Sequence, residues 1–152
     1  MPITGEYEPS ESAWVAKQVA EYEESGGTRA NTLRDSGLPI VIVTMIGAKS
    51  GRVRKVGLMR VEHGGEYALV ASKGGAPEHP GWYANLVADP HVMIQDGPAP
   101  RDYVVREVEG AERREWWDRS VAAFPTYASY AEKTERLIPV LVASPVQAVS
   151  RR

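Results

Sequence analysis

The apolar and polar positions of this chain follow two patterns, one typical of strands and one typical of helices. Short apolar runs rich in β-branched residues and bounded by glycine or proline predict strands. The run from Pro39 to Ile46 is apolar almost throughout, which predicts a strand buried on both faces. The predicted strands cover residues 39–46, 53–62, 66–72, 91–95, 101–109 and 138–142.

Glycine and proline turns join most of these strands as hairpins. Gly64-Gly65 predicts one tight turn, and Asp96-Gly97-Pro98 predicts another. Because hairpins connect antiparallel neighbours, about six strands joined in this way favour a small antiparallel barrel over a parallel sheet. Helices are predicted among them at residues 10–24, 82–88, 112–123 and 127–135, which makes the fold class α+β.

The chain is long enough, at 152 residues, for one core. Ser10 or Ser12 is the expected N-cap of the first helix, which ends at Gly26-Gly27 before a polar linker that reaches Gly37. We therefore divide the chain into an N-terminal helix and linker, residues 1–30, and a barrel domain, residues 31–152.

Charge is spread unevenly along the chain. A formal net charge of -2 argues against nucleic acid as a partner. No acidic residue occurs between Asp35 and Glu62, a segment that holds Lys49, Arg52, Arg54, Lys55 and Arg60. This segregation predicts a strongly positive local surface that fits a small anionic ligand.

The chain has no cysteine, which excludes disulfides and agrees with a reducing compartment. It shows no basic and apolar leader and no apolar run near the roughly 20 residues that span a bilayer, so we expect a soluble cytoplasmic protein. Trp14, Val15, Val19 and Tyr22 form an apolar stripe, which leaves peripheral contact with the inner face of the plasma membrane open. The neighbouring glutamates instead favour packing against the barrel.

The turn at residues 47–52 combines two glycines with Lys49 and Ser50, and Arg54 follows it. Its order differs from a P-loop, because Lys-Ser precedes the second glycine. The alternative interpretation is a solvated basic hairpin.

Residues 71–86 leave a strand, pass through Lys73-Gly74-Gly75 and enter a helix after Pro80. Gly74 and Gly75 would let backbone N–H groups approach a ligand closely, and Pro80 would set the φ of a first helical turn that attracts oxyanions. This order suits the anionic tail of a cofactor.

Aromatic residues supply further candidates. Trp82 could wall a pocket or lie in the core, and the hydroxyls of Tyr127 and Tyr130 share one helix face, where they could enter a pocket or be solvated. The three histidines lack a carboxylate at zinc-like spacing, so no metal site is expected.

Three segments together resemble the deazaflavin-dependent nitroreductase family of actinobacteria. They are the 47–52 turn, the run from Ala71 to Leu86 containing Lys-Gly-Gly and Trp-Tyr, and Pro125-x-Tyr-x-x-Tyr with the following Lys133-Thr134-x-Arg136-x-Ile138-Pro139. The resemblance covers residues 30–145 and implies a split β-barrel and the cofactor F420, an 8-hydroxy-5-deazaflavin.

By this resemblance, ten residues would contact the cofactor. Those holding its phosphate and oligoglutamate tail would be Lys49, Ser50, Arg54 and Lys55, and those along its phosphate, ribityl and ring regions would be Ala71, Ser72, Lys73, Trp82, Asn85 and Leu86. Tyr127, Tyr130 and Ser72 would provide catalytic hydroxyls on the substrate side. Phe124 and Gly81 depart from the family's pattern.

The implied reaction is hydride transfer from reduced F420 to an electron-poor small molecule, such as a quinone, an activated alkene or a nitroaromatic compound. Two alternatives are an oxidoreductase that uses flavin mononucleotide (FMN) on the same barrel and a non-catalytic module that binds the deazaflavin or a quinone. The oligomeric state is left open.

Overall fold

The computed structural model describes residues 3–33 and 36–146. The helices and strands follow one another along the chain in the order α1 (Ala13–Glu24), β1 (Ile40–Ile46), β2 (Val53–Met59), β3 (Glu62–His63), β4 (Glu66–Val70), the short 3₁₀ helix η2 (Lys73–Gly75), α2 (Gly81–Ala88), β5 (His91–Gln95), β6 (Pro100–Glu107), α3 (Gly110–Ala123), α4 (Thr126–Lys133) and β7 (Val140–Pro145).

The strands form a seven-stranded sheet in the order β2-β1-β5-β6-β7-β4-β3, with antiparallel pairing throughout. The sheet curls around one apolar cluster, to which β1, β4, β5, β6 and β7 all contribute. Alternate residues of β1 serve two cores, because Val41 and Val43 belong to this cluster whereas Ile40 and Ile42 pack on the opposite face. The predicted α+β barrel and the doubly buried strand are thus confirmed.

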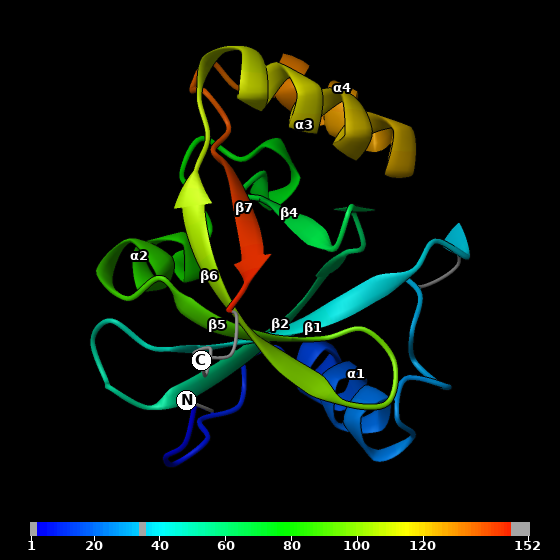
Figure 1. Ribbon diagram of the computed structural model, residues 1–152, viewed down its shortest axis with the longest axis vertical. Helices are drawn as coiled ribbons and strands as arrows, with labels where there is room; N and C mark the ends of the chain where they lie inside the picture. The colour runs from blue at the N-terminus through cyan, green and yellow to red at the C-terminus, as the bar shows by residue number, and fades with distance from the viewer. Residues whose placement is uncertain (1–2, 34–35, 147–152) are drawn as a thin grey trace, which may run out of the picture.

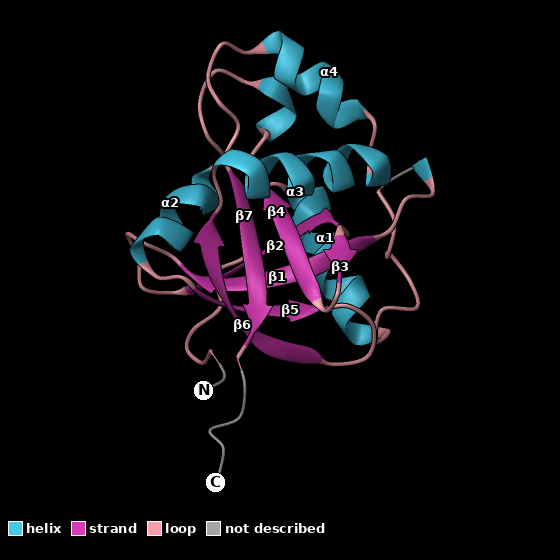
Figure 2. Cartoon of the chain, turned by 45° about the horizontal axis from the view of Figure 1, so that its top comes forward, coloured by secondary structure: helices cyan, strands magenta, loops and turns pink. Residues whose placement is uncertain are grey.

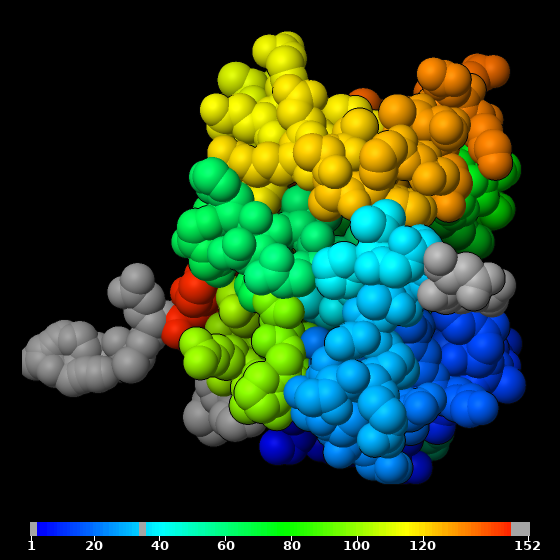
Figure 3. Space-filling view, turned by 90° about the vertical axis from the view of Figure 1, so that its right-hand side faces the viewer, coloured from blue at the N-terminus to red at the C-terminus, as the bar shows by residue number. Residues whose placement is uncertain are grey.

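Helices cover the outside of the barrel. In Figures 1 and 2, α3 and α4 lie over one end of the molecule, while α1 lies beside β1 and β2 at the other. Val19 and Tyr22 of α1 are buried, and the Tyr22 hydroxyl donates to the Gln95 carbonyl at 3.1 Å and accepts from the Gly97 amide at 2.9 Å. In Figure 3 the described residues between α1 and β1, 25–33 and 36–39, lie on this face of the molecule, below α3 and α4. No helix within the described residues is long and apolar enough to cross a membrane.

Several predicted boundaries were wrong by a few residues. The first helix begins at Ala13, with Ser12 at the N-cap, and the predicted strand 53–62 ends at Met59, before the separate short strand β3. The last strand begins at Val140, not Ile138, since Pro139 has no N–H to donate and its carbonyl instead accepts from the Ala71 amide at 2.9 Å. Residues 34–35 of the predicted linker and 147–152 of the predicted barrel domain lie outside the described residues.

Candidate functional site

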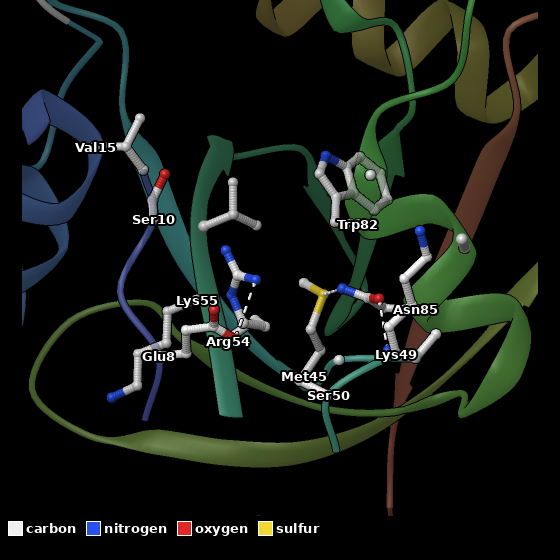
Figure 4. A pocket seen from close by; sticks show the side chains of 15 residues that line it. Glu8, Ser10, Val15, Met45, Lys49, Ser50, Arg54, Lys55, Trp82 and Asn85 are labelled. Atoms are coloured by element: carbon white, nitrogen blue, oxygen red, sulfur yellow. Dashed lines mark hydrogen bonds and ion pairs between the residues drawn. The ribbon is translucent and has the colours of Figure 1, made fainter. Parts of the chain in front are cut away.

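A cavity of about 650 Å³ opens between the β1–β2 turn, strand β2, the N-terminal end of α2 and the segment that leads into α1 (Figure 4). Six of the residues expected to hold a cofactor line it, namely Lys49, Ser50, Arg54, Lys55, Trp82 and Asn85. Met45, Val56 and Val15 contribute apolar surface. The cavity therefore combines an apolar wall with a cationic edge, as a site for a flat ligand with an anionic end requires.

The β1–β2 turn is held in one shape by hydrogen bonds within it and to α2. The Gly51 amide donates to the Gly47 carbonyl at 2.9 Å, and Gly51 has φ +70, which favours glycine. The Ala48 amide donates to the Asn85 Oδ1 atom at 2.9 Å, and the Asn85 Nδ2 atom donates to the Met45 sulfur at 3.5 Å. Lys49 is exposed at the tip of this turn, beside the cavity.

The N-terminal end of α2 forms the adjoining wall. Pro80 is the N-cap of α2 and has extended backbone (ψ 152), so the expectation that it sets the first helical turn is wrong; Gly81 begins the helix. A Cβ on Gly81 would meet nothing within 4 Å, so this glycine widens the cavity rather than relieving a contact. Trp82 is half-buried and packs on the barrel interior, which holds its ring at the cavity wall.

The cations of the site are met by carboxylates from elsewhere in the chain. The Arg54 Nη1 atom lies 3.5 Å from the Glu8 Oε1 atom, and the Lys55 Nζ atom lies 2.5 Å from the Glu23 Oε2 atom. Arg52 and Arg60 likewise pair with Glu6 and Asp96. The expected strongly positive surface is therefore largely neutralised, because the N-terminal segment, α1 and the β5–β6 turn bring acidic groups to it.

Lys49 is the exception among the predicted cofactor-binding cations of the cavity. Within residues 3–33 and 36–146 it makes no ion pair, so its ammonium group is available to a ligand.

The Lys73-Gly74-Gly75 turn packs against α4. A Cβ on Gly75 would lie 2.9 Å from the Tyr130 carbonyl oxygen and 3.1 Å from the Tyr130 Cα atom. Gly75 is therefore required by contact with α4, and the expectation that it allows approach to a ligand is wrong. A Cβ on Gly74 would meet nothing within 4 Å, while Lys73 is exposed and pairs with Glu78 at 3.4 Å.

Arg136 fixes the loop that follows this turn. Its guanidinium donates to the Ser72 carbonyl at 2.8 Å and to the Ala76 carbonyl at 2.9 Å, and its Nη1 atom lies 2.9 Å from the His79 Nδ1 atom. Because arginine can only donate, the His79 Nδ1 atom is the acceptor in this pair.

Six predicted site residues do not line the cavity, and the exposed Lys73 is one of them. Leu86 is buried in the barrel interior, and Ala71 and Ser72 are buried between β4 and η2. Tyr127 is only 4% exposed and packs with Phe124 at 5.0 Å between ring centroids, whereas Tyr130 is half-buried. Burial raises the pKa of the Tyr127 hydroxyl, so it stays protonated.

Val15 connects the tyrosines with the cavity. It lines the cavity and also packs on the apolar cluster that contains Tyr127 and, at its edge, Tyr130. Val15 of α1 is therefore shared between the cavity lining and the apolar cluster to which the tyrosines belong.

Sequence reasoning missed Glu8, Ser10 and Val15 as cavity residues. They lie in a segment that precedes the barrel, and their local pattern carries no sign of where that segment packs. The only signal was the apolar stripe on the first helix, which indicated packing against the barrel. Among the described residues, no group of three or more histidine and acidic side chains could hold a metal ion.

The barrel and its cavity define a binding protein for a planar ligand with an anionic end. Over residues 14–145 the chain matches the family model described as F420H(2)-dependent quinone reductase, and it belongs to that family.

Related proteins agree with this assignment. An F420H(2)-dependent quinone reductase of Mycobacterium tuberculosis (strain ATCC 25618 / H37Rv) is 36% identical over 107 residues, which are 68% of this chain and 72% of the relative. The solved structure of an F420-H2 dependent reductase, FDR-A, is 55% identical, with a TM-score of 0.67, and the match covers 70% of this chain and 94% of that chain. A structure described as a domain-swapped dimer is 49% identical, with a TM-score of 0.69, over 89% of this chain and all of the other.

Proposed function

We propose that this protein is an oxidoreductase that uses reduced F420 to reduce a quinone. The observation that carries the proposal is the cavity beside the β1–β2 turn, which is lined both by Lys49, a cation that makes no ion pair within the described residues, and by the Trp82 ring. Family membership supports the choice of F420 as the reductant and of a quinone as the acceptor.

The residues present fit this cofactor. Lys49 and Arg54 would hold its anionic groups through charge-assisted hydrogen bonds, and Ser50 would add a hydroxyl donor. Trp82 offers an aromatic face to a planar ring system, and the open space at Gly81 leaves room beside it. Lys55 would contribute if its pair with Glu23 rearranged.

The cofactor supplies a hydride to the acceptor when it is bound. The chain's own task is to place the acceptor and to stabilise the negative charge that develops on its oxygen. Tyr130 is the better placed of the two tyrosines for this role, because it is half-buried whereas the Tyr127 ring lies in the core. Ser72 is buried behind the Lys73 turn, and its hydroxyl would act on the same side of the acceptor as Tyr130.

The test compares ligands and then acceptors. Fluorescence titration at matched ionic strength should give a lower Kd for F420 than for FMN. Oxidation of reduced F420 by a soluble naphthoquinone should then proceed at a rate proportional to enzyme. Tighter binding of FMN would favour a flavin enzyme, and F420 binding without turnover of quinone, enone or nitroaromatic acceptors would favour a storage module.

The double variant Lys49→Ala/Arg54→Ala should raise the Kd for F420 by about tenfold or more, because each charge-assisted bond contributes about 1.5–3 kcal/mol before solvent screening. Lys17→Ala/Arg114→Ala is the matched control, since it removes two exposed cations that do not line the cavity. An unchanged Kd in the folded Lys49→Ala/Arg54→Ala variant would support the alternative interpretation of the turn as a solvated basic hairpin.

A further inference from the structure

The segment before α1 is fastened to the edge of β2 at the cavity. Tyr7 forms a parallel bridge with Val53. The Val53 amide donates to the Glu6 carbonyl at 2.8 Å, and the Glu8 amide donates to the Val53 carbonyl at 2.9 Å. The Tyr7 ring also lies 5.0 Å from the Lys55 Nζ atom. These contacts set the position of Glu8 without any contribution from its side chain.

The carboxylate of Glu8 thereby reaches a cation that the proposed function requires. Its Oε1 atom lies 3.5 Å from the Arg54 Nη1 atom, and both side chains line the cavity. A carboxylate and an anionic ligand group offer the same kind of acceptor to a guanidinium. Glu8 therefore occupies the position at which an anionic part of a ligand would meet Arg54.

The pair is suited to exchange. The Arg54 and Glu8 side chains are 35% and 38% exposed, and ion pairs this open to water are weak. Because the backbone bonds to Val53 do not involve the carboxylate, the side chain can swing into solvent while the segment stays in place. Displacement of the Glu8 carboxylate from Arg54 thus costs little free energy, but this cost lowers the affinity of every ligand that binds Arg54.

We propose that Glu8 is a built-in competitor for anionic ligands at Arg54 and thereby sets the affinity of the cavity for them. This inference rests on the proposed function for the identity of the ligand, F420, but not for the competition itself. Lys49 is open to the ligand at once, whereas Arg54 becomes available only when Glu8 leaves.

The test is a set of titrations with two probes, F420 followed by fluorescence and inorganic tripolyphosphate followed by calorimetry. Glu8→Gln should lower both Kd values by about threefold to fivefold, the range expected for loss of a weak ion pair. Glu11→Gln is the matched control, since it removes one charge from the same segment at an exposed position that does not line the cavity. Circular dichroism should show both variants folded.

A double-mutant cycle distinguishes competition from a general effect of charge. In an Arg54→Gln background, Glu8→Gln should change the two Kd values no more than Glu11→Gln does, since no guanidinium is left to release. A gain that persists without Arg54, or that Glu11→Gln reproduces, would overturn the inference, as would unchanged affinity in Glu8→Gln. If F420 does not bind at all while tripolyphosphate behaves as expected, the proposed function fails and the competition stands.

Discussion

Replacement of Gly75 by alanine should destabilise the protein through its contact with α4. Gly75 has φ +83, and its new Cβ would lie 2.9 Å from the Tyr130 carbonyl oxygen, 3.1 Å from the Tyr130 Cα atom and 3.1 Å from the Lys133 Cβ atom. Two of these three atoms belong to the backbone of α4, so no side-chain rotation relieves the overlap. Either η2 or α4 must move.

The neighbouring glycine allows this cost to be separated from that of the backbone conformation. Gly74 has φ +64, and its Cβ would meet nothing within 4 Å, so Gly74→Ala carries only the left-handed penalty of about 1–2 kcal/mol. Gly75→Ala carries a similar penalty and adds overpacking, which typically costs about 1–3 kcal/mol. The difference in unfolding free energy between the two variants should therefore be about 1–3 kcal/mol.

Urea unfolding followed by tryptophan fluorescence measures this difference, because the chain has four tryptophans. Gly75→Ala should unfold at a clearly lower urea midpoint than Gly74→Ala, with a similar m-value. Equal midpoints for the two variants would show that η2 does not press on α4 in solution, and would refute the packing described for the Lys73-Gly74-Gly75 turn.

Three further predictions concern the tyrosines and Arg136. Tyr130→Phe should lower kcat/KM for quinone reduction by about tenfold while F420 binding persists. Steady-state kinetics measures this, with Tyr127→Phe as the comparison at a buried position, and wild-type turnover by Tyr130→Phe would contradict the prediction. The hydrogen bond from Tyr83 to Glu107, with burial, raises the pKa of the Tyr83 hydroxyl to about 12. The Tyr83–Glu107 hydrogen bond contributes fully to stability below about pH 10, and this contribution is lost as the pH rises through about 12. The free energy of unfolding should therefore fall less steeply over this range in Tyr83→Phe than in the wild type. Arg136→Lys should lower the melting temperature, because a compact ammonium group lacks the planar fork whose Nε, Nη1 and Nη2 atoms each reach a different acceptor. An unchanged melting temperature in calorimetry would contradict that role.

The barrel was predictable because its signals are local. The β-branched run of β1 and the Gly64-Gly65 turn each identify a strand or hairpin within ten residues of sequence, and the structure confirms both. Lys49 and Trp82 line one cavity, although only the family resemblance linked two segments so far apart in the chain, and their shared role in holding a cofactor stays a prediction.

The contacts between distant segments were not predictable from the sequence pattern. Glu8 lies 46 positions before Arg54, and the sequence of an acidic segment does not indicate which cation it will pair with. Gly75 shows the same limit, because a glycine required by a neighbouring helix and a glycine required by a ligand look alike in sequence. Packing decides between these interpretations, and packing is a property of the whole fold.

The hydrogen bond between the Ala48 amide and Asn85 has a consequence for the rate and strength of binding. Because Asn85 belongs to a helix anchored in the barrel core through the next residue, Leu86, the turn that carries Lys49 is preorganised as soon as the chain folds. The entropy of ordering that turn is lost during folding and not again on association. A ligand therefore meets a receptor whose backbone is already set, and only side chains such as Lys49 remain to be immobilised.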